Sequence, residues 1–390
     1  MPKACVVFTT VFDPVVLDSY YRNFEKFGRL DQVEIVVIPD KKTPESAWSR
    51  CRDLTRRGLR ADCPTLKEQD DFLKTLGLPP EFIPYNSDNR RNVGYLMALD
   101  RDCDFVISLD DDNYALDRED VFAAHSIVTA GSACYEVIET AGGFFNIYSL
   151  LAFENGPLPV YPRGYPFAAR HNDAAVIGGM ETGEIHLNAG LYLSAPDIDA
   201  LSWLVLKPRV KALLGETKIL GRHTWSPMNT QNTAVRREAL AAYYFLRMGY
   251  PIAGAAIDRY GDIFSGYFVQ ACAKHLGGLL RAGTPIVDHR RNNHNYIKDA
   301  TLEWGAILVL EDLLPWLREV RLTGASYLEA YRSLSAELQD AAERFKGLAW
   351  NDSTRGFLHQ AAYHMRTWSD ACETVAGRLA SRKAPRVAAC

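Results

Sequence analysis

Three consecutive aspartates, Asp110, Asp111 and Asp112, constrain this chain more than any other feature of its sequence. The run FVISL at 105–109 directly before them is apolar, rich in strand-forming residues and too short for a helix, which predicts a buried strand. Adjacent carboxylates repel one another when they are buried without a counter-ion. A divalent cation would satisfy them, because hard cations prefer carboxylate oxygens and ligands bind at the carboxyl ends of strands in open α/β sheets. The sequence therefore predicts a metal and ligand site here; a solvated acidic turn is the alternative.

Composition is that of a globular protein. The chain has 390 residues, of which 47% are hydrophobic and 24% charged, and this is enough for a large core. The formal net charge of −4 gives no positive field to favour nucleic acid or an anionic membrane. No apolar run reaches the roughly 18 residues of a spanning helix, and the start lacks the pattern of a signal peptide. None of the eight cysteines forms a CxxC pair, which argues against a zinc cage and favours a reduced, cytoplasmic protein.

The N-terminal region predicts a βαβ unit, and hence a parallel sheet. Residues 3–10 and 33–40 are apolar strand patterns, and apolar residues at helical spacing join them until Gly28. The turns after both strands are expected on the same sheet edge as the three aspartates. The candidates there for binding a nucleotide are Thr9, Thr10, Phe12 and Asp40. Ordinary caps and turns are the alternative for each of them.

Residues 87–102 predict a helix that leads toward the strand before the aspartates. Arg91 and Asn92 lie near its start. They are candidates for contacting a diphosphate, although a solvated helix end would have the same composition.

The segment VYPRGYPFAARHND, residues 160–173, predicts a structured loop, because its prolines and glycine disfavour a helix or a central strand. Arg163 and Arg170 are seven residues apart in it. Two guanidiniums on an ordered loop suit a pyrophosphate or a sugar phosphate. Surface salt bridges explain them equally well.

Two later segments contribute further candidates. Residues 185–200 read as an alternating strand, in which Asn188 lies beside small residues that allow a backbone to approach a ligand closely. The following segment leads into a predicted helix at about 233–248. Another helix begins at Asp262, which is a candidate for a catalytic carboxylate or a sugar-hydroxyl acceptor, or is only a cap.

Residues 284–296 predict a short strand that ends at His289, a candidate third metal ligand with Arg290 and Arg291 near phosphate. A structural histidine is the alternative. Beyond this point the apolar periodicity is helical. We therefore expect a catalytic domain at 1–300, a helical region at 301–384 that packs on it or makes a homo-oligomer contact, and a disordered tail at 385–390.

The order of these segments resembles that of the reversibly glycosylated polypeptides, the UDP-arabinopyranose mutases of plants and their bacterial relatives. The resemblance runs from about residue 85 to 300 and rests on DDD, RGYPFAAR, NAGLYL, MNTQNTAVRREAL, DIFSGY and KHLGG. It implies a GT-A-like α/β fold, with a mostly parallel sheet flanked by helices. It also implies a nucleotide-diphosphate sugar, bound with Mn²⁺ or Mg²⁺ and interconverted between its pyranose and furanose forms.

The resemblance also implies roles for single residues. The three aspartates match the metal and nucleotide motif, with Asp110 and Asp112 as metal ligands and His289 as a third by analogy. Arg163 matches the site of reversible glycosylation, and Arg170 matches a second essential arginine. A general acid/base is needed to move a hydroxyl proton, and Asp262 is the candidate. Flavin is not expected, because no GxGxxG follows a predicted strand.

The sequence departs from the plant pattern at several places, including FAAR where plants have FSLR. Some bacterial relatives act on GDP-linked hexoses in antibiotic pathways, and we therefore favour a GDP-hexose over UDP-arabinose. A glycosyltransferase that uses the same donor is the alternative enzyme. A non-catalytic nucleotide-sugar-binding partner is the alternative from another class.

Overall fold

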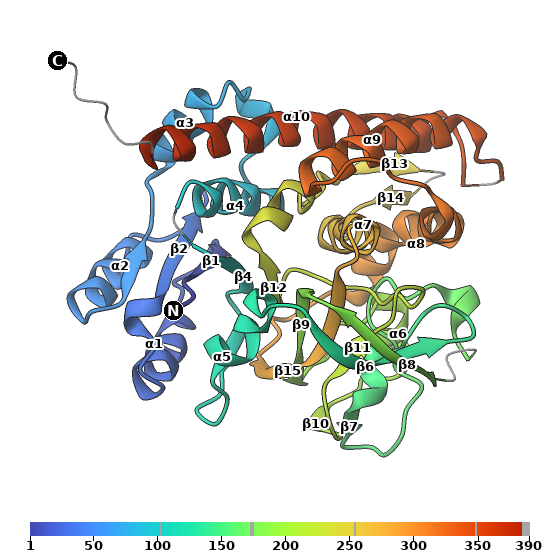
Figure 1. Ribbon diagram of the computed structural model, residues 1–390, viewed down its shortest axis with the longest axis horizontal. Helices are drawn as coiled ribbons and strands as arrows, with labels where there is room; N and C mark the ends of the chain where they lie inside the picture. The colour runs from blue at the N-terminus through green and yellow to red at the C-terminus, as the bar shows by residue number, and fades with distance from the viewer. Residues whose placement is uncertain (102, 172–174, 253–254, 348, 384–390) are drawn as a thin grey trace.

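The fold is built on one large mixed sheet (Figure 1). The computed structural model describes residues 1–101, 103–171, 175–252, 255–347 and 349–383. Thirteen strands join in the sheet, whose main path runs β3-β2-β1-β4-β12-β9-β15-β11-β6-β8, and β13 and β14 form a separate pair. The strands are β1 (Ala4–Thr10), β2 (Val33–Pro39), β3 (Arg60–Asp62), β4 (Phe105–Asp110), β5 (Asn113–Ala115), β6 (Ala133–Thr140), β7 (Leu151–Phe153), β8 (Ala175–Gly183), β9 (Ile185–Ser194), β10 (Val210–Leu213), β11 (Lys218–Leu220), β12 (Asn232–Arg236), β13 (Tyr250–Ile252), β14 (Ala255–Ile257) and β15 (Leu279–His289).

Strand direction brings distant parts of the chain to one edge of the sheet. β3, β2, β1 and β4 are parallel to one another. β12 is antiparallel to both β4 and β9, so β9 runs in the direction of β4, and β15 is parallel to β9. The carboxyl ends of β1, β2, β4, β9 and β15 therefore lie on the same edge. The prediction of an α/β fold with a mainly parallel central sheet is confirmed.

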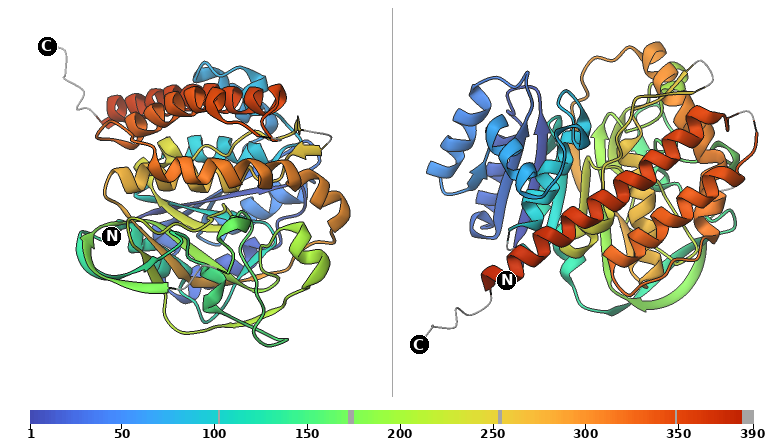
Figure 2. Two further views of the ribbon diagram at one scale, coloured as in Figure 1. Left: turned by 90° about the vertical axis from the view of Figure 1, so that its right-hand side faces the viewer. Right: turned by 90° about the horizontal axis from the view of Figure 1, so that it is seen from above.

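Helices cover both faces of this sheet (Figures 1 and 2). Alternate side chains of β1 point to opposite faces. Val6 and Phe8 belong to the hydrophobic cluster that includes α1, α2 and α5, and Val7 belongs to the cluster that includes α4 and α7 to α10. The helices are α1 (Leu17–Lys26), α2 (Ser46–Arg56), α3 (Leu66–Thr75), α4 (Arg91–Leu99), α5 (Val121–His125), α6 (Ala200–Val205), α7 (Gly261–His275), α8 (Tyr296–Glu319), α9 (Tyr327–Arg344) and α10 (Asp352–Lys383).

The predicted helix at 233–248 is wrong. Residues 232–236 form β12, which is buried between β4 and β9, and a short 3-10 helix at Arg237–Ala242 follows it. Thr233 and Val235 are β-branched and fit a buried central strand better than a helix. The apolar residues whose helical spacing led to this prediction come after the strand.

The predicted C-terminal helices are present as α8, α9 and α10. They share a hydrophobic cluster with α4 and α7, and Trp368 of α10 donates a hydrogen bond to the carbonyl of Leu240 at 3.0 Å. α10 crosses the molecule from α9 to the N-terminal half, where Arg378 donates to Thr75 Oγ1 at 2.8 Å (Figures 1 and 2). The predicted disordered tail at 385–390 lies outside the described residues.

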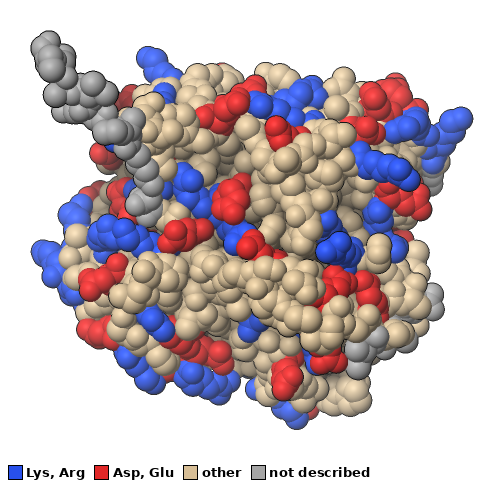
Figure 3. All heavy atoms as spheres, viewed as in Figure 1, with Lys and Arg blue, Asp and Glu red and all other residues tan. Residues whose placement is uncertain are grey.

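Acidic and basic side chains are interspersed over the face of the molecule seen in Figure 3. This agrees with the small net charge of the sequence. Within the described ranges, every helix is too short or too polar to cross a bilayer.

Gly266 sets the close packing of α7 against the segment before β12. A Cβ atom at this position would lie 2.0 Å from the carbonyl oxygen of Met228. A backbone oxygen cannot rotate away as a side chain can. With a larger residue at this position, α7 and the segment before β12 would therefore have to move apart. The segment after Met228 contributes Thr230 and Gln231 to the functional cavity described below.

We expect Gly266→Ala to lower the free energy of unfolding by about 1–3 kcal/mol, since overpacking forces backbone shifts. The matched control is Gly356→Ala in α10, where an added Cβ meets nothing within 4 Å. This control should leave stability unchanged or raise it by up to about 1 kcal/mol through helix propensity. Denaturant unfolding of both variants measures the difference, and equal effects would contradict the close packing.

Candidate functional site

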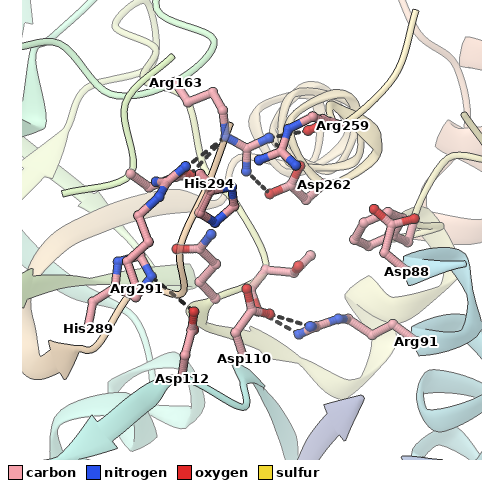
Figure 4. Close-up of a pocket in the computed structure, with 14 residues that line it drawn as sticks. Asp88, Arg91, Asp110, Asp112, Arg163, Arg259, Asp262, His289, Arg291 and His294 are labelled. Carbon is pink, nitrogen blue, oxygen red and sulfur yellow. Dashed lines mark hydrogen bonds and ion pairs between the residues drawn. The ribbon is translucent and has the colours of Figure 1, made fainter. Parts of the chain in front are cut away.

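Two adjoining cavities open where β1, β2 and β4 end. The inner cavity has a volume of about 200 Å³ and the outer cavity about 380 Å³. Asp88, Arg91 and Asp110 line both, so the two spaces are contiguous. Figure 4 shows the residues of the inner cavity. The charged residues and histidines of the inner cavity are Asp88, Arg91, Asp110, Asp112, Arg163, Asp197, Arg259, Asp262, His289, Arg291 and His294.

The three aspartates have three different partners. Asp110 pairs with the buried guanidinium of Arg91, which also donates to the Leu109 carbonyl at 3.0 Å. Asp111 accepts a hydrogen bond of 2.5 Å from Thr10 Oγ1. Asp112 Oδ2 lies 3.4 Å from His289 Nε2. Arg91 thus supplies a counter-ion to Asp110, and burial raises the pKa of Asp111 to about 6.

His289 is oriented as a metal-binding histidine would be. Its Nδ1 lies 2.6 Å from the carbonyl oxygen of Ala195, which can only accept, so Nδ1 carries the proton and Nε2 faces Asp112. Metal-bound histidines commonly donate their second N–H to a carbonyl in this way. In the part of the chain that the structure describes, no three His, Cys, Asp or Glu side chains cluster closely enough to form a complete metal site. Asp112 and His289 fit a divalent cation whose other ligands come from elsewhere, such as substrate phosphates.

The outer cavity gathers the residues predicted after the first two strands. Thr9, Thr10, Phe12 and Asp40 all line it, so their expected position on one sheet edge is confirmed. Phe12 is 57% exposed and offers a free aromatic face. Asp40 accepts a hydrogen bond of 2.7 Å from the backbone N–H of Asn86, which fixes the carboxylate against the cavity wall.

Arg163 lies between two buried carboxylates at the far side of the inner cavity (Figure 4). Its Nε donates to both oxygens of Asp197 at 3.0 and 3.1 Å, and its Nη2 donates to Asp262 Oδ2 at 2.7 Å. Its Nη1 reaches Asp262 Oδ1 at 3.3 Å and also donates to the carbonyl of Arg259. All three charged side chains are buried. Arg163 and Asp262, which the sequence suggests for separate roles, thus form a direct ion pair.

The charges in this cluster are unequal. Burial raises the pKa of Asp262 to about 6, with the negative charge of Asp197 adding to the effect of burial. For Asp197 burial works in the same direction, but its contact with Arg163 outweighs burial and lowers the pKa. The Arg163 guanidinium therefore faces two different carboxylates: Asp197, which stays ionised, and Asp262, which accepts a proton more readily.

Arg170 lies outside both cavities. It donates to Asp199 Oδ2 at 2.8 Å and stacks over the ring of Phe167 at 3.6 Å. Asp199 is the N-cap of α6 and accepts from Ser202 N–H. Arg170 thus fastens the loop to α6, and its predicted catalytic role remains a prediction that this geometry does not favour.

Asn92 and Asn188 also lie outside the cavities. Asn92 exchanges two hydrogen bonds with the backbone of Phe245, a cavity residue, at 2.8 and 2.9 Å. Asn188 is buried in β9 and bonds to His125 and Arg281 at 2.9 and 2.8 Å. Their polar groups are used within the fold, so direct contact with a ligand has no support here.

Several cavity residues were not predicted from the sequence. Asp197 follows β9, and the antiparallel strand β12, which aligns β9 with β4, lies where the sequence predicts a helix. If β12 were predicted as a strand, β9 would be parallel to β4, and Asp197 would be expected on the edge of the sheet that binds ligands. The other unpredicted charged or titratable residues are Asp88, Arg259 and His294.

We expect Arg163→Met to destabilise the protein by about 3–5 kcal/mol, because it leaves two buried carboxylates without their cation. The loss should shrink as pH falls from about 8 to about 5, since protonation removes the unpaired charges. The control is Arg332→Met, because Arg332 also meets two carboxylates, Asp370 at 2.6 Å and Glu373 at 2.8 Å, but on the surface. That pair should contribute at most about 1 kcal/mol. Similar denaturant midpoints for both variants would refute the buried pairing.

Among solved structures, the chain is similar to two proteins in complex with nucleotide sugars. For TarS residues 1–349 from S. aureus in complex with UDP-GlcNAc, the TM-score is 0.44 and the identity 11%, covering 98% of this chain and 93% of that one. For glucosyl-3-phosphoglycerate synthase from Mycobacterium tuberculosis with Mn²⁺, UDP-glucose and phosphoglyceric acid, the TM-score is 0.40 and the identity 12%. That match covers 83% of this chain and 82% of the other. The family assignment comes from sequence similarity instead.

Plant UDP-arabinopyranose mutases are among the sequence relatives of this chain. UDP-arabinopyranose mutase 1 of Arabidopsis thaliana is 26% identical over 275 residues, which cover 69% of this chain and 71% of the relative. UDP-arabinopyranose mutase 2 of the same plant is 24% identical over 324 residues, covering 82% and 81%. A family model described as "Reversibly glycosylated polypeptide" matches residues 56–377. This match extends through α8 and α9 and most of α10, beyond the region of resemblance that the motifs indicate. The chain therefore belongs to the reversibly glycosylated polypeptide family.

Proposed function

We propose that this protein is a flavin-independent, metal-dependent mutase that interconverts the pyranose and furanose forms of a nucleotide-diphosphate sugar. The observation that carries the proposal is the pair of contiguous cavities in a member of this family, with Arg163 held between two carboxylates at the inner end. Such a layout provides separate places for a nucleoside, a diphosphate and a sugar.

The outer cavity receives the nucleoside. Phe12 offers its exposed ring to the base, and Asp40 and the threonines after β1 offer hydrogen-bond partners. The diphosphate then lies at the junction marked by Arg91, Asp110 and Asp88, and the sugar enters the inner cavity toward Arg163.

Charge balance in the inner cavity supports a requirement for a divalent cation. Five aspartates line it against four arginines, so it has no surplus positive charge to attract a diphosphate. Asp112 and His289, with Asp110 beside them, would hold the cation. When bound, Mn²⁺ or Mg²⁺ supplies positive charge that stabilises the diphosphate as it leaves the anomeric carbon.

The protein's own cations complete this electrostatic stabilisation. Of the four arginines that line the inner cavity, Arg291 alone makes no ion pair with a described residue. Its guanidinium is placed over the ring of Trp203, 5.2 Å from the centroid, and remains available to phosphate oxygens. Arg91 is committed to Asp110, so its main role is to fix that carboxylate.

Arg163 acts in this proposal as a fixed positive charge and not as a nucleophile. Burial opposes its charge, but Asp197 and Asp262 outweigh burial and raise the pKa of the guanidinium well above its ordinary value. A protonated guanidinium has no free electron pair to attack the sugar. Intact-mass spectra during turnover should accordingly contain no sugar adduct at Arg163, and such an adduct would require the covalent route.

The donor is proposed to be a GDP-linked hexose, with UDP-arabinopyranose as the comparison donor because the plant relatives are named for it. The purified protein is incubated with Mn²⁺ and a panel of GDP- and UDP-sugars, and products are resolved by chromatography and NMR of the sugar ring. We expect a furanose isomer from one donor, abolished by EDTA.

We expect Asp112→Ala and His289→Ala each to lower the isomerisation rate by about 100-fold or more, since each removes a ligand for the cation. Asp71→Ala in α3 is the control, because Asp71 is an exposed aspartate paired with Lys67 far from the cavities. Slow hydrolysis without an isomer would favour a glycosyltransferase instead. Tight, Mn²⁺-dependent binding without any turnover would favour a non-catalytic partner.

A further inference from the structure

His294 lines the inner cavity and pairs with Asp299, a buried residue of α8. His294 Nδ1 lies 2.9 Å from Asp299 Oδ2 in the first turn of α8. A carboxylate oxygen accepts, so Nδ1 carries the proton and the electron pair resides on Nε2. No described residue forms a hydrogen bond with Nε2, whereas both oxygens of Asp299 have partners. The imidazole is therefore held in the tautomer of a base.

The orientation of the His294 ring is fixed by packing as well as by Asp299. The ring stacks on Tyr296 with centroids 6.1 Å apart and an interplanar angle of 13°, and Tyr296 stacks on Trp203 at 5.4 Å and 12°. Asp299 is buried and is held from its other side by Arg259 Nη1 at 3.4 Å. These contacts restrict ring rotation, as a group that transfers protons requires.

The pair is also joined to the Arg163 cluster. The side chain of Arg259 contacts Asp299 and Glu303, while its backbone carbonyl accepts a hydrogen bond from Arg163. His294, Arg163, Asp262 and Asp112 all line the inner cavity, and the view in Figure 4 draws the imidazole between Arg163 and Asp112. A sugar whose diphosphate lies near Asp112 would have its ring within reach of the imidazole.

We infer that His294 is the proton carrier for ring exchange in the proposed mutase reaction and that Asp299 is its positioning residue. This inference rests on the proposed function. It assigns the proton transfer to a different group from Asp262, both of whose oxygens accept hydrogen bonds from Arg163.

The steps balance without any further reagent. The bond between the anomeric carbon and the diphosphate breaks, and the diphosphate leaves with the electron pair. The hydroxyl that closes the new ring attacks the anomeric carbon, and its proton passes to His294 Nε2. The imidazolium then returns this proton to the old ring oxygen as the bond from that oxygen to the anomeric carbon breaks. The diphosphate adds back to the anomeric carbon, and His294 is neutral again.

The charged groups that face His294 are Asp299 on α8, Arg291 on the same loop, and Arg259 before α7. Burial and the two arginines lower the pKa of His294 below its ordinary value of 6.5, although Asp299 works in the opposite direction. The neutral base is thus the resting form near pH 7. The isomerisation rate should therefore fall as the pH drops through this lowered pKa of His294.

The test compares variants of the full-length protein with Mn²⁺ and the donor that the wild type isomerises. His294→Ala should lower kcat by about 100-fold or more, the usual contribution of general acid–base catalysis, with the Kd for the nucleotide sugar unchanged. Added imidazole should restore part of the rate in proportion to its free-base concentration. The matched control is His359→Ala, which removes a surface histidine paired with Glu343 at 2.6 Å and should leave the rate unchanged.

Asp299→Asn tests the positioning role. It removes the negative charge that raises the pKa of His294, so the acid limb of the kcat profile should move to lower pH as the rate falls. A purely structural role would leave the limb in place.

The outcomes separate the inference from the proposed function. Isomerisation by the wild type with an undiminished rate in His294→Ala would overturn the inference alone. A reduced rate without imidazole rescue and with an unmoved acid limb in Asp299→Asn would also overturn it and return the role to Asp262. A wild type that forms no isomer from any donor would overturn both.

Discussion

The burial of Arg163 between Asp197 and Asp262 is the interaction on which the rest of the site depends. Its three members come from the loop before β8, the turn after β9 and the start of α7. A buried charge without a partner costs several kcal/mol, so these segments cannot separate independently. The ion pairs thus hold three distant parts of the chain in one arrangement. The same arrangement leaves charge at the inner end of the cavity, where a reacting sugar would meet it.

Pairing also determines what the cavity can bind. Arg91, Arg163 and Arg259 each neutralise carboxylates that would otherwise repel one another. Their positive charge is therefore already balanced and adds little attraction for an anion. In the proposed function, the remaining attraction for a diphosphate would come from Arg291 and from a cation near Asp112. In the proposed reaction, this balance would let the protein bind a nucleotide sugar and still release the diphosphate when a cation stabilises it.

Much of the fold could be predicted from the sequence, because the buried strands at 4–10, 33–39 and 105–110 are continuous apolar runs. The residues that directly follow these strands lie on the predicted edge of the sheet, because correctly predicted parallel strands place their carboxyl ends together. β12 could not be recognised, since its five residues merge with an apolar stretch of helical spacing. The small neighbours of Asn188 suggest a close approach of a ligand, but they do not reveal that its side chain belongs to a buried network with His125 and Arg281. His294 gave no signal, because its partner Asp299 is placed beside it only by the start of α8.

The spacing of the two arginines in the loop now has a physical explanation. Asp197 and Asp199 are two residues apart, and they bind Arg163 and Arg170 respectively. The loop is thus fastened to one short segment by two ion pairs, of which only the first faces the cavity. Glu311 of α8 adds a third attachment by accepting the Ala168 N–H at 3.0 Å. Loss of Arg170 would let the loop move and would misplace Arg163 without removing any group that contacts the substrate. An arginine can therefore be essential at this position while lying outside the site.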